Sequence, residues 1–230
     1  MIMKIDDTLN KRCSSKLGPL IVLFFIFLLP FLTAAQVRPD LSLVGQRFNV
    51  LIKNKNFQDS LVQLSRVYNV PIGFQVSDEA ESPPCKEPID LDLRDADISQ
   101  IMDRLILACP TYSWSLAEGA VNVFPSVKEQ SVLDVWVANI NIKRKGSEKI
   151  LDAIFDQEEV KRELKSSGSI RDTTAAFWEG NSKADQTYSI TFSEKQVRDI
   201  LNYLIVNTEK RSWIYYRLSN EKTRFSLRFF

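Results

Sequence analysis

A segment of about twenty residues occurs twice in this chain at a constant spacing of 99 positions. Both copies end in a tryptophan, Trp114 and Trp213, and the apolar positions before each tryptophan match while the polar positions differ. The matching pairs are Leu93 and Phe192, Ile98 and Val197, Ile101 and Ile200, Met102 and Leu201, Leu105 and Leu204, and Ile106 and Ile205. Retained apolar positions with variable polar ones are typical of a duplicated structural unit. The chain is therefore predicted to be a tandem of one small module.

The first 35 residues have the organisation of an export signal. Basic residues precede an apolar stretch at 20–32, and the small residues Thr33, Ala34 and Ala35 follow it, which is the pattern of a secretory signal peptide. The apolar stretch contains Pro30 and is shorter than the ~20 residues that a membrane span needs. Cleavage after Ala35 is therefore favoured over an uncleaved anchor. We expect an exported protein, periplasmic or extracellular, of a bacterial envelope, with membrane contact only through this segment if it is uncleaved.

The charge balance gives no reason to expect a nucleic-acid partner. The formal net charge of the 230 residues is +1, and removal of the predicted leader, with four basic and two acidic residues, leaves the chain close to neutral. A nucleic-acid-binding surface normally shows a strong basic excess. Hydrophobic residues make up 44% of the chain, which is enough for two modules with cores of their own.

The first module is predicted to run strand-helix-strand and then, after a loop at 77–88, strand-helix-hairpin. Apolar residues alternate in the predicted strands and follow helical spacing in the predicted helices. The strands are expected at 48–52, 70–76 and 89–93, the helices at 57–68 and 98–109, and the hairpin at 112–123.

The second module is predicted to follow the same order, with strands at 137–142 and 188–192, helices around 150–155 and at 197–208, and a hairpin that begins at Trp213. The offset between the modules grows from 90 to 99, so nine residues were added within the polar stretch 156–186. We expect a long loop there. The predicted fold class is α+β, with helices packed on small mixed sheets. The predicted organisation is a signal peptide at 1–35, a linker at 36–44, a first module at 45–125, a connector at 126–133 and a second, more divergent module at 134–230.

The first module resembles the STN or secretin N0 type of domain, which secretins and TonB-dependent receptors share at their N-termini. The resemblance rests on apolar spacing at 48–64, on Val70-Pro-Ile-Gly-Phe74, on the alternating strand before Ile98, and on Tyr112-Ser-Trp114 with Val121-Asn-Val123. A weaker copy covers about 134–230. The chain is thus similar to a tandem pair of such domains without the secretin channel or the outer-membrane barrel. The resemblance implies a periplasmic domain that contacts partner proteins and has no catalytic residues.

The residues that usually carry enzymatic chemistry are scarce. The sequence contains no histidine and no phosphate-binding glycine loop, which removes most catalytic triads and zinc sites. We therefore predict no enzymatic activity, no cofactor and no metal site. One acidic run is considered as a calcium site: Asp90, Asp92, Asp95 and Asp97. It lacks the glycine and the distal glutamate of a calcium loop. A solvent-exposed strand face and a helix N-terminus explain it better. Glu158, Glu159 and Glu163 are poor candidates for an acid–base pair.

Cys85 and Cys109 lie beyond the predicted leader. Two cysteines in an oxidising compartment are candidates for a disulfide, which would connect a loop to the end of a helix. The alternative is that Cys109, on the apolar face of its helix, is a small buried hydrophobic residue. Spacing alone leaves both open.

The aromatic residues provide the candidates for a contact surface. Trp114 and Trp213 are expected to be equivalent core positions because they recur at a fixed offset. Phe177 and Trp178 lie in the polar insertion and are better interaction candidates. Phe225 and Leu227 belong to the last arm of the chain, where one strand edge is expected to remain available for strand addition by a partner.

These observations lead to a functional hypothesis. We expect a non-enzymatic cell-envelope protein that acts through protein contacts, as an accessory to a secretion or TonB-type transport system. The alternative is a periplasmic protein that binds a small ligand or peptidoglycan in a cleft between the two copies.

Overall fold

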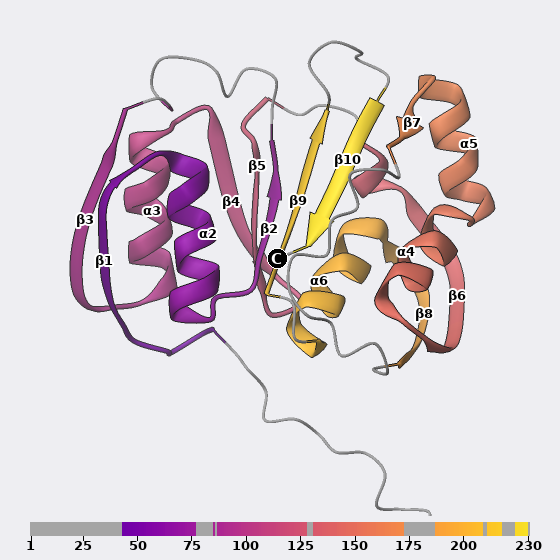
Figure 1. Cartoon of the computed structure of the whole chain (residues 1–230), viewed down its shortest axis with the longest axis horizontal. Helices are drawn as coiled ribbons and strands as arrows, with labels where there is room; N and C mark the ends of the chain where they lie inside the picture. Colours follow the sequence, from indigo (N-terminus) through magenta and orange to yellow (C-terminus); the bar gives the residue numbers. More distant parts are fainter. Residues whose placement is uncertain are drawn as a thin grey trace, which may run out of the picture. The chain divides into compact units, whose positions relative to one another are not determined.

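The structure is a computed structural model that describes residues 43–76, 85, 87–127, 131–172, 187–208, 211–217 and 224–229. The predicted cleavage point after Ala35 lies outside these residues. The described residues form five α-helices and ten strands, with helices packed on small mixed sheets, which confirms the predicted α+β fold (Figure 1). Residues 41–230 form one compact unit. No helix in the described ranges is long and apolar enough to cross a membrane.

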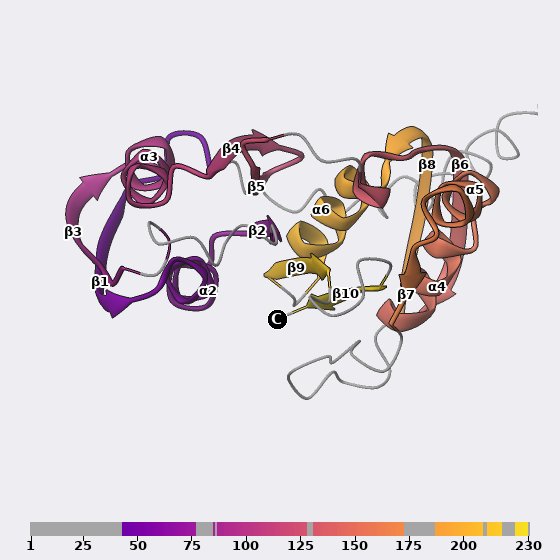
Figure 2. The ribbon, with the colours of Figure 1, turned by 90° about the horizontal axis from the view of Figure 1, so that it is seen from above.

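The first module encloses two helices between two small groups of strands. Antiparallel pairs form between β1 and β3 and between β4 and β5, and β5 pairs in parallel with β2. Figure 2 shows α2 and α3 between the β1–β3 pair and the other three strands. The elements are β1 (Phe48–Lys55), α2 (Phe57–Tyr68), β2 (Ile72–Gln75), β3 (Ile89–Ala96), α3 (Ile98–Ala108), β4 (Tyr112–Ala117) and β5 (Ala120–Pro125).

The second module has the same topology with one additional helix. β6 pairs antiparallel with β8, β9 pairs antiparallel with β10, and β10 pairs in parallel with β7. A short 3-10 helix, η4 (Val132–Asp134), precedes this module. The elements are β6 (Trp136–Lys145), α4 (Ser147–Phe155), α5 (Glu158–Ser167), β7 (Ile170–Arg171), β8 (Tyr188–Gln196), α6 (Val197–Asn207), β9 (Ser212–Arg217) and β10 (Arg224–Phe229).

Local backbone features recur at the same offsets as the apolar residues. Asn54 and Arg144, 90 positions apart, both have positive φ angles (51° and 48°), beside a register shift in the β1–β3 and β6–β8 ladders respectively. Asp95 and Glu194, 99 positions apart, both have φ of 51°. Positive φ is uncommon outside glycine. The duplication therefore extends from the core to the irregularities of the strands.

The two modules share a sheet. β2 pairs in parallel with β9, which gives a continuous six-stranded sheet of order β4-β5-β2-β9-β10-β7. The strand directions in the second trio are the reverse of those in the first, so the modules are related by a half-turn about an axis that crosses the strands, together with a shift of three strands along that axis. The half-turn places the helices of the two modules on opposite faces of the sheet. Accordingly, Ile214 of β9 packs in the core with α2 and α3, whereas its neighbours Trp213 and Tyr215 pack in the core with α4 and α6.

The expectation of a loop at 156–186 is wrong for its first part, because residues 158–167 form α5. The local sequence contains ordinary helix signals: Glu158 and Glu159 in the first turn, Lys165 in the last, and Gly168 at the C-terminus with a positive φ of 65°. The helix buries Val160 as its main apolar contact. Leu164, four residues later, is partly buried against the same cluster. Two apolar contacts on a highly charged helix give a weak periodic pattern, which explains why the pattern predicted a loop.

Candidate interaction surfaces

The point where the two modules meet is filled by Trp213. Its side chain has no exposed surface and lies over Gly73 of β2, the residue that pairs with it in the β2–β9 ladder. A Cβ atom at position 73 would overlap the indole ring. A glycine is therefore needed at this position for space, because the strand and the ring must approach each other closely. We call this contact the seam.

A buried hydrogen-bond chain crosses the seam from the second module to the first. The indole Nε1 of Trp213 donates to Oδ1 of Asn202 in α6 at 3.0 Å, and Nδ2 of Asn202 donates to Oδ1 of Asn122 in β5 at 3.0 Å. Asn122 is 1% exposed and Asn202 is fully buried. Both ends of the Asn202 amide are hydrogen-bonded, and a buried amide satisfied in this way fixes the relative position of the elements that carry its partners.

Arg198, in the first turn of α6, forms a second polar connection. Its NH2 group donates to Oε1 of Gln75 in β2 at 2.8 Å and to Oδ1 of Asp134 in η4 at 3.1 Å. The guanidinium also lies over the ring of Phe124 in β5, 5.8 Å from its centroid. A planar guanidinium suits such a site because it can stack and donate several hydrogen bonds together. α6 is thus joined to both β2 and β5 of the other module.

A partly exposed ion pair also joins the two modules. Lys195 in β8 is paired with Glu118, at the tip of the β4–β5 hairpin, and the hydrogen bond to Glu118 raises the pKa of Lys195 above its ordinary value. Asp199 lies nearby in α6. Burial raises the pKa of Asp199, and the negative charge of Glu118 raises it further.

One end of the sheet carries the counterpart of Trp213 on a strand with a single neighbour among the described residues. Within the described residues, β4 is an edge strand that pairs with β5 alone. Its Trp114 is only partly buried, and the indole Nε1 donates to Oδ1 of Asp103 in α3 at 2.9 Å. Asp103 precedes Asn202 by 99 positions, as Trp114 precedes Trp213. The expectation of two equivalent core tryptophans therefore needs correction. The same type of hydrogen bond occurs in both modules, but of the two tryptophans only Trp213 is fully buried. Of their two strands, only β9 has a neighbour on each side within the described residues.

The residues of β4 leave its outer edge without charge. Its sequence, Tyr-Ser-Trp-Ser-Leu-Ala, has no charged residue and no proline, and the side chain of Leu116 is 36% exposed. Edge strands commonly carry lysine, proline or a bulge that prevents pairing with another strand. β4 has none of these.

The four interaction candidates from the sequence do not come together here. Phe177 and Trp178 lie outside the described residues. Phe225 and Leu227 are 1% and 2% exposed, in the core with α4 and α6. Their strand, β10, was expected to have a free edge, and this is corrected in part: β9 pairs with one side, and β7 pairs with Arg224 and Phe225 on the other. A partner could reach the side chains of Phe225 and Leu227 only if the core opened.

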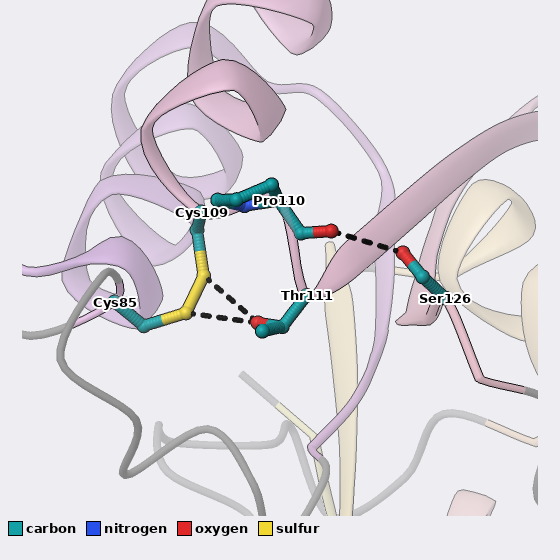
Figure 3. The surroundings of a disulfide bond; sticks show 5 residues. All are labelled: Cys85, Cys109, Pro110, Thr111 and Ser126. Carbon is teal, nitrogen blue, oxygen red and sulfur yellow. Dashed lines mark hydrogen bonds between the residues drawn. A yellow bond between two sulfur atoms is a disulfide. The ribbon is translucent and has the colours of Figure 1, made fainter.

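The two cysteines are joined. A disulfide links Cys85 and Cys109, whose Cα atoms are 4.9 Å apart (Figure 3). The hydroxyl of Thr111 lies 3.2 Å from Sγ of Cys85, and the hydroxyl of Ser126 donates to the carbonyl of Pro110 at 3.2 Å. The bridge therefore connects the segment before β3 to the turn between α3 and β4, next to the edge strand.

The acidic residues of the sequence analysis have separate structural contacts. Asp97 is the N-cap of α3 and forms a capping box with Gln100, and Asp90 accepts a hydrogen bond from the backbone of Asn54 at 2.8 Å. Glu158 is paired with Lys161 on the surface of α5. Among the described residues, no group of three or more potential ligands is placed to hold a metal ion.

Several residues of the seam and the β4 edge were not singled out in the sequence: Gly73, Asn122, Arg198, and the pair Asp103 and Asn202. One signal was available. When the two copies are aligned at 99 positions, Asp103 and Asn202 occupy matching polar positions eleven residues before the paired tryptophans. The residues from β2 and β5 carried no such signal, because their partners lie in the other module.

No model of a known protein family, no curated protein and no solved structure matches this chain.

Proposed function

We propose that this chain is a non-enzymatic protein-interaction module of the bacterial cell envelope, built from two STN-like units and accessory to a secretion or TonB-type transport system. The observation that carries the proposal is the uncharged outer edge of β4, at the end of a sheet that both modules build together. Exposed strand edges of this kind are templates for contacts with other chains.

The rigidity of the seam supports this proposal. Trp213, Asn202 and Asn122 are buried and hydrogen-bonded to one another, so α6 is fixed against strands of both modules. A docking surface on a rigid sheet loses less conformational freedom on binding than a surface on mobile segments does. The basic leader and short apolar stretch of the sequence support the envelope location.

The test is a cross-linking scan in the bacterium that expresses the full chain. A photo-reactive amino acid replaces one exposed residue at a time: Leu51, Leu107, Ser115 and Trp136, which lie on β1, α3, β4 and β6. The expected result is a discrete adduct with an envelope protein from at least one position, identified by mass spectrometry. The chain produced without its first 35 residues is the control, since it should lose the adduct by staying in the cytoplasm. Absence of a protein adduct at every position, together with calorimetric binding of peptidoglycan fragments, would favour the ligand-binding alternative.

A further inference from the structure

The chain carries an internal example of the contact that β4 lacks. β4 and β9 are the same strand of the repeated module, and β9 has β10 on one side and β2 on the other. Among the described residues, β4 has only the equivalent of the first neighbour, β5. We propose that the outer edge of β4 binds an extended, glycine-containing segment of a partner protein, parallel to β4, in the way that β9 binds β2. The inference rests on the proposed function and names the surface and the kind of partner.

The backbone of β4 presents suitable groups. The backbone N–H of Ser126 donates to the carbonyl of Thr111, so odd-numbered residues of this strand face β5. Alternation then directs the N–H and C=O groups of Trp114 and Leu116 away from β5. In the seam, the carbonyls of Arg211 and Tyr215 accept from Ile72 and Val76 across the same side of β9. Leu116 of β4 lies at the same offset as Tyr215.

The tryptophan sets the requirement for glycine. Trp213 lies so close to β2 that no side chain fits beneath its ring, and the residue at that place is Gly73. Trp114 has the same place in its module, and its indole is fixed by the same type of hydrogen bond to α3. An added strand in the same register therefore places one residue beneath the Trp114 ring, and glycine is the residue that fits without displacement of the ring.

A second copy of this chain is a poorer occupant than another protein. The element equivalent to β2 is β7, which forms the other end of the sheet. β7 consists of Ile170 and Arg171, and the sequence has no glycine from position 169 to 179. The chain therefore does not supply, in its own edge strand, the residue that the Trp114 position requires.

The experiment uses a synthetic peptide with the sequence of residues 70–76, Val-Pro-Ile-Gly-Phe-Gln-Val, extended by two lysines for solubility. Its control is the same peptide with valine in place of glycine. Binding to the purified full-length protein is measured by calorimetry and by the fluorescence of Trp114, with a Trp114→Phe variant to assign the signal. We expect the glycine peptide to bind at least about tenfold more tightly, a difference of about 1.4 kcal/mol. Equal binding of both peptides, or no binding of either, would overturn the proposal.

Variants at Leu116 test the backbone contact separately. Leu116→Pro removes an N–H that points away from β5, whereas Leu116→Ala removes the side chain and keeps the N–H. Binding should fall about tenfold in the proline variant and change less than about threefold in the alanine variant. If the proline variant does not fold, the peptide pair still decides. Equal binding to the two folded variants contradicts the contact.

The remaining outcomes separate this inference from the proposed function. Sedimentation of the protein alone tests the second copy: a dimer that Leu116→Pro abolishes assigns the edge to self-association and overturns the choice of occupant. A cross-linked partner at another position, without peptide binding at β4, keeps the proposed function and rejects this site.

Discussion

The two modules have the same topology, yet they place the same tryptophan in different surroundings. Trp213 is enclosed between two neighbouring strands and hydrogen-bonded to a buried amide, whereas Trp114 lies on an edge strand and is hydrogen-bonded to the carboxylate of Asp103. The type of acceptor matches its exposure to solvent. A carboxylate is stable where water reaches it, and an uncharged amide is tolerated where water is excluded. Among the described residues, the same strand of the module has a second neighbour in one copy and not in the other.

The modules are also stabilised by different means. The first has a disulfide, Cys85–Cys109, next to its edge strand. The second has no cysteine and instead has α5 and the contacts of α6 with β2 and β5. The first module thus carries a covalent constraint that the second does not have.

The largest difference is expected between alanine substitutions of the two tryptophans. Trp213→Ala removes a fully buried ring at the seam and should lower the free energy of unfolding by about 4 kcal/mol. Trp114→Ala, at a partly buried position, should cost about half as much or less. Urea denaturation of both variants gives the comparison. Equal losses would mean that the enclosed and the edge tryptophan contribute equally to stability, contrary to this expectation.

Loss of the disulfide should cause the second-largest decrease in the free energy of unfolding. The bridge spans a sequence separation of 24 residues, and the closure of such a loop contributes about 3 kcal/mol. The double variant Cys85→Ala/Cys109→Ala should therefore lose stability by about this amount. Thermal unfolding of the wild-type protein should shift downward with reductant, and the double variant should not respond. A response of the variant to reductant would point to another redox-sensitive group.

Exchanging the acceptor of each tryptophan, Asp103 for Asn or Asn202 for Asp, should lower the free energy of unfolding in the second module only. Asn202→Asp places a carboxylate in the buried chain and removes the donor to Asn122, and we expect a loss of about 2 kcal/mol. Asp103→Asn keeps an acceptor for Trp114 at an exposed site and should change the stability by less than about 0.5 kcal/mol. Chemical denaturation at neutral pH compares the two. Similar losses would show that solvent access does not determine the choice of residue.

The smallest effect concerns pH. Burial and the charge of Glu118 raise the pKa of Asp199 in the folded state, so the folded protein binds this proton more tightly than the unfolded chain does. The contribution of Asp199 to stability therefore falls as the pH rises from the ordinary aspartate pKa through the raised value. Asp199→Asn should flatten this part of the pH profile and stabilise the protein at neutral pH by less than about 1 kcal/mol, since the group is partly solvated. Urea denaturation between about pH 4 and 7 measures it; an unchanged profile would remove Asp199 as its source.

Much of the fold was predictable because its signals are local. The 99-residue spacing predicted equivalent helices, and α3 and α6 begin at Ile98 and Val197, 99 positions apart. Alternation predicted the β4–β5 and β9–β10 hairpins. The helix α5 was missed since its charged sequence hides one buried anchor, Val160.

The tandem of one α+β module was predictable from the amino-acid sequence, because apolar spacing reflects which side of each element is buried. The sequence left the disulfide open and gave no sign of the β2–β9 junction. Three features became evident only in the folded chain. Trp213 is enclosed, Trp114 lies on a strand that forms the sheet edge among the described residues, and the last arm is paired with β9 and, at its start, with β7. The physical reason is that strand neighbours depend on backbone groups, which are nearly the same in every residue and leave little trace in the side chains. At the seam the only side-chain signal of the pairing was Gly73. The need for glycine there is understood only from Trp213, which is 140 positions away in the sequence.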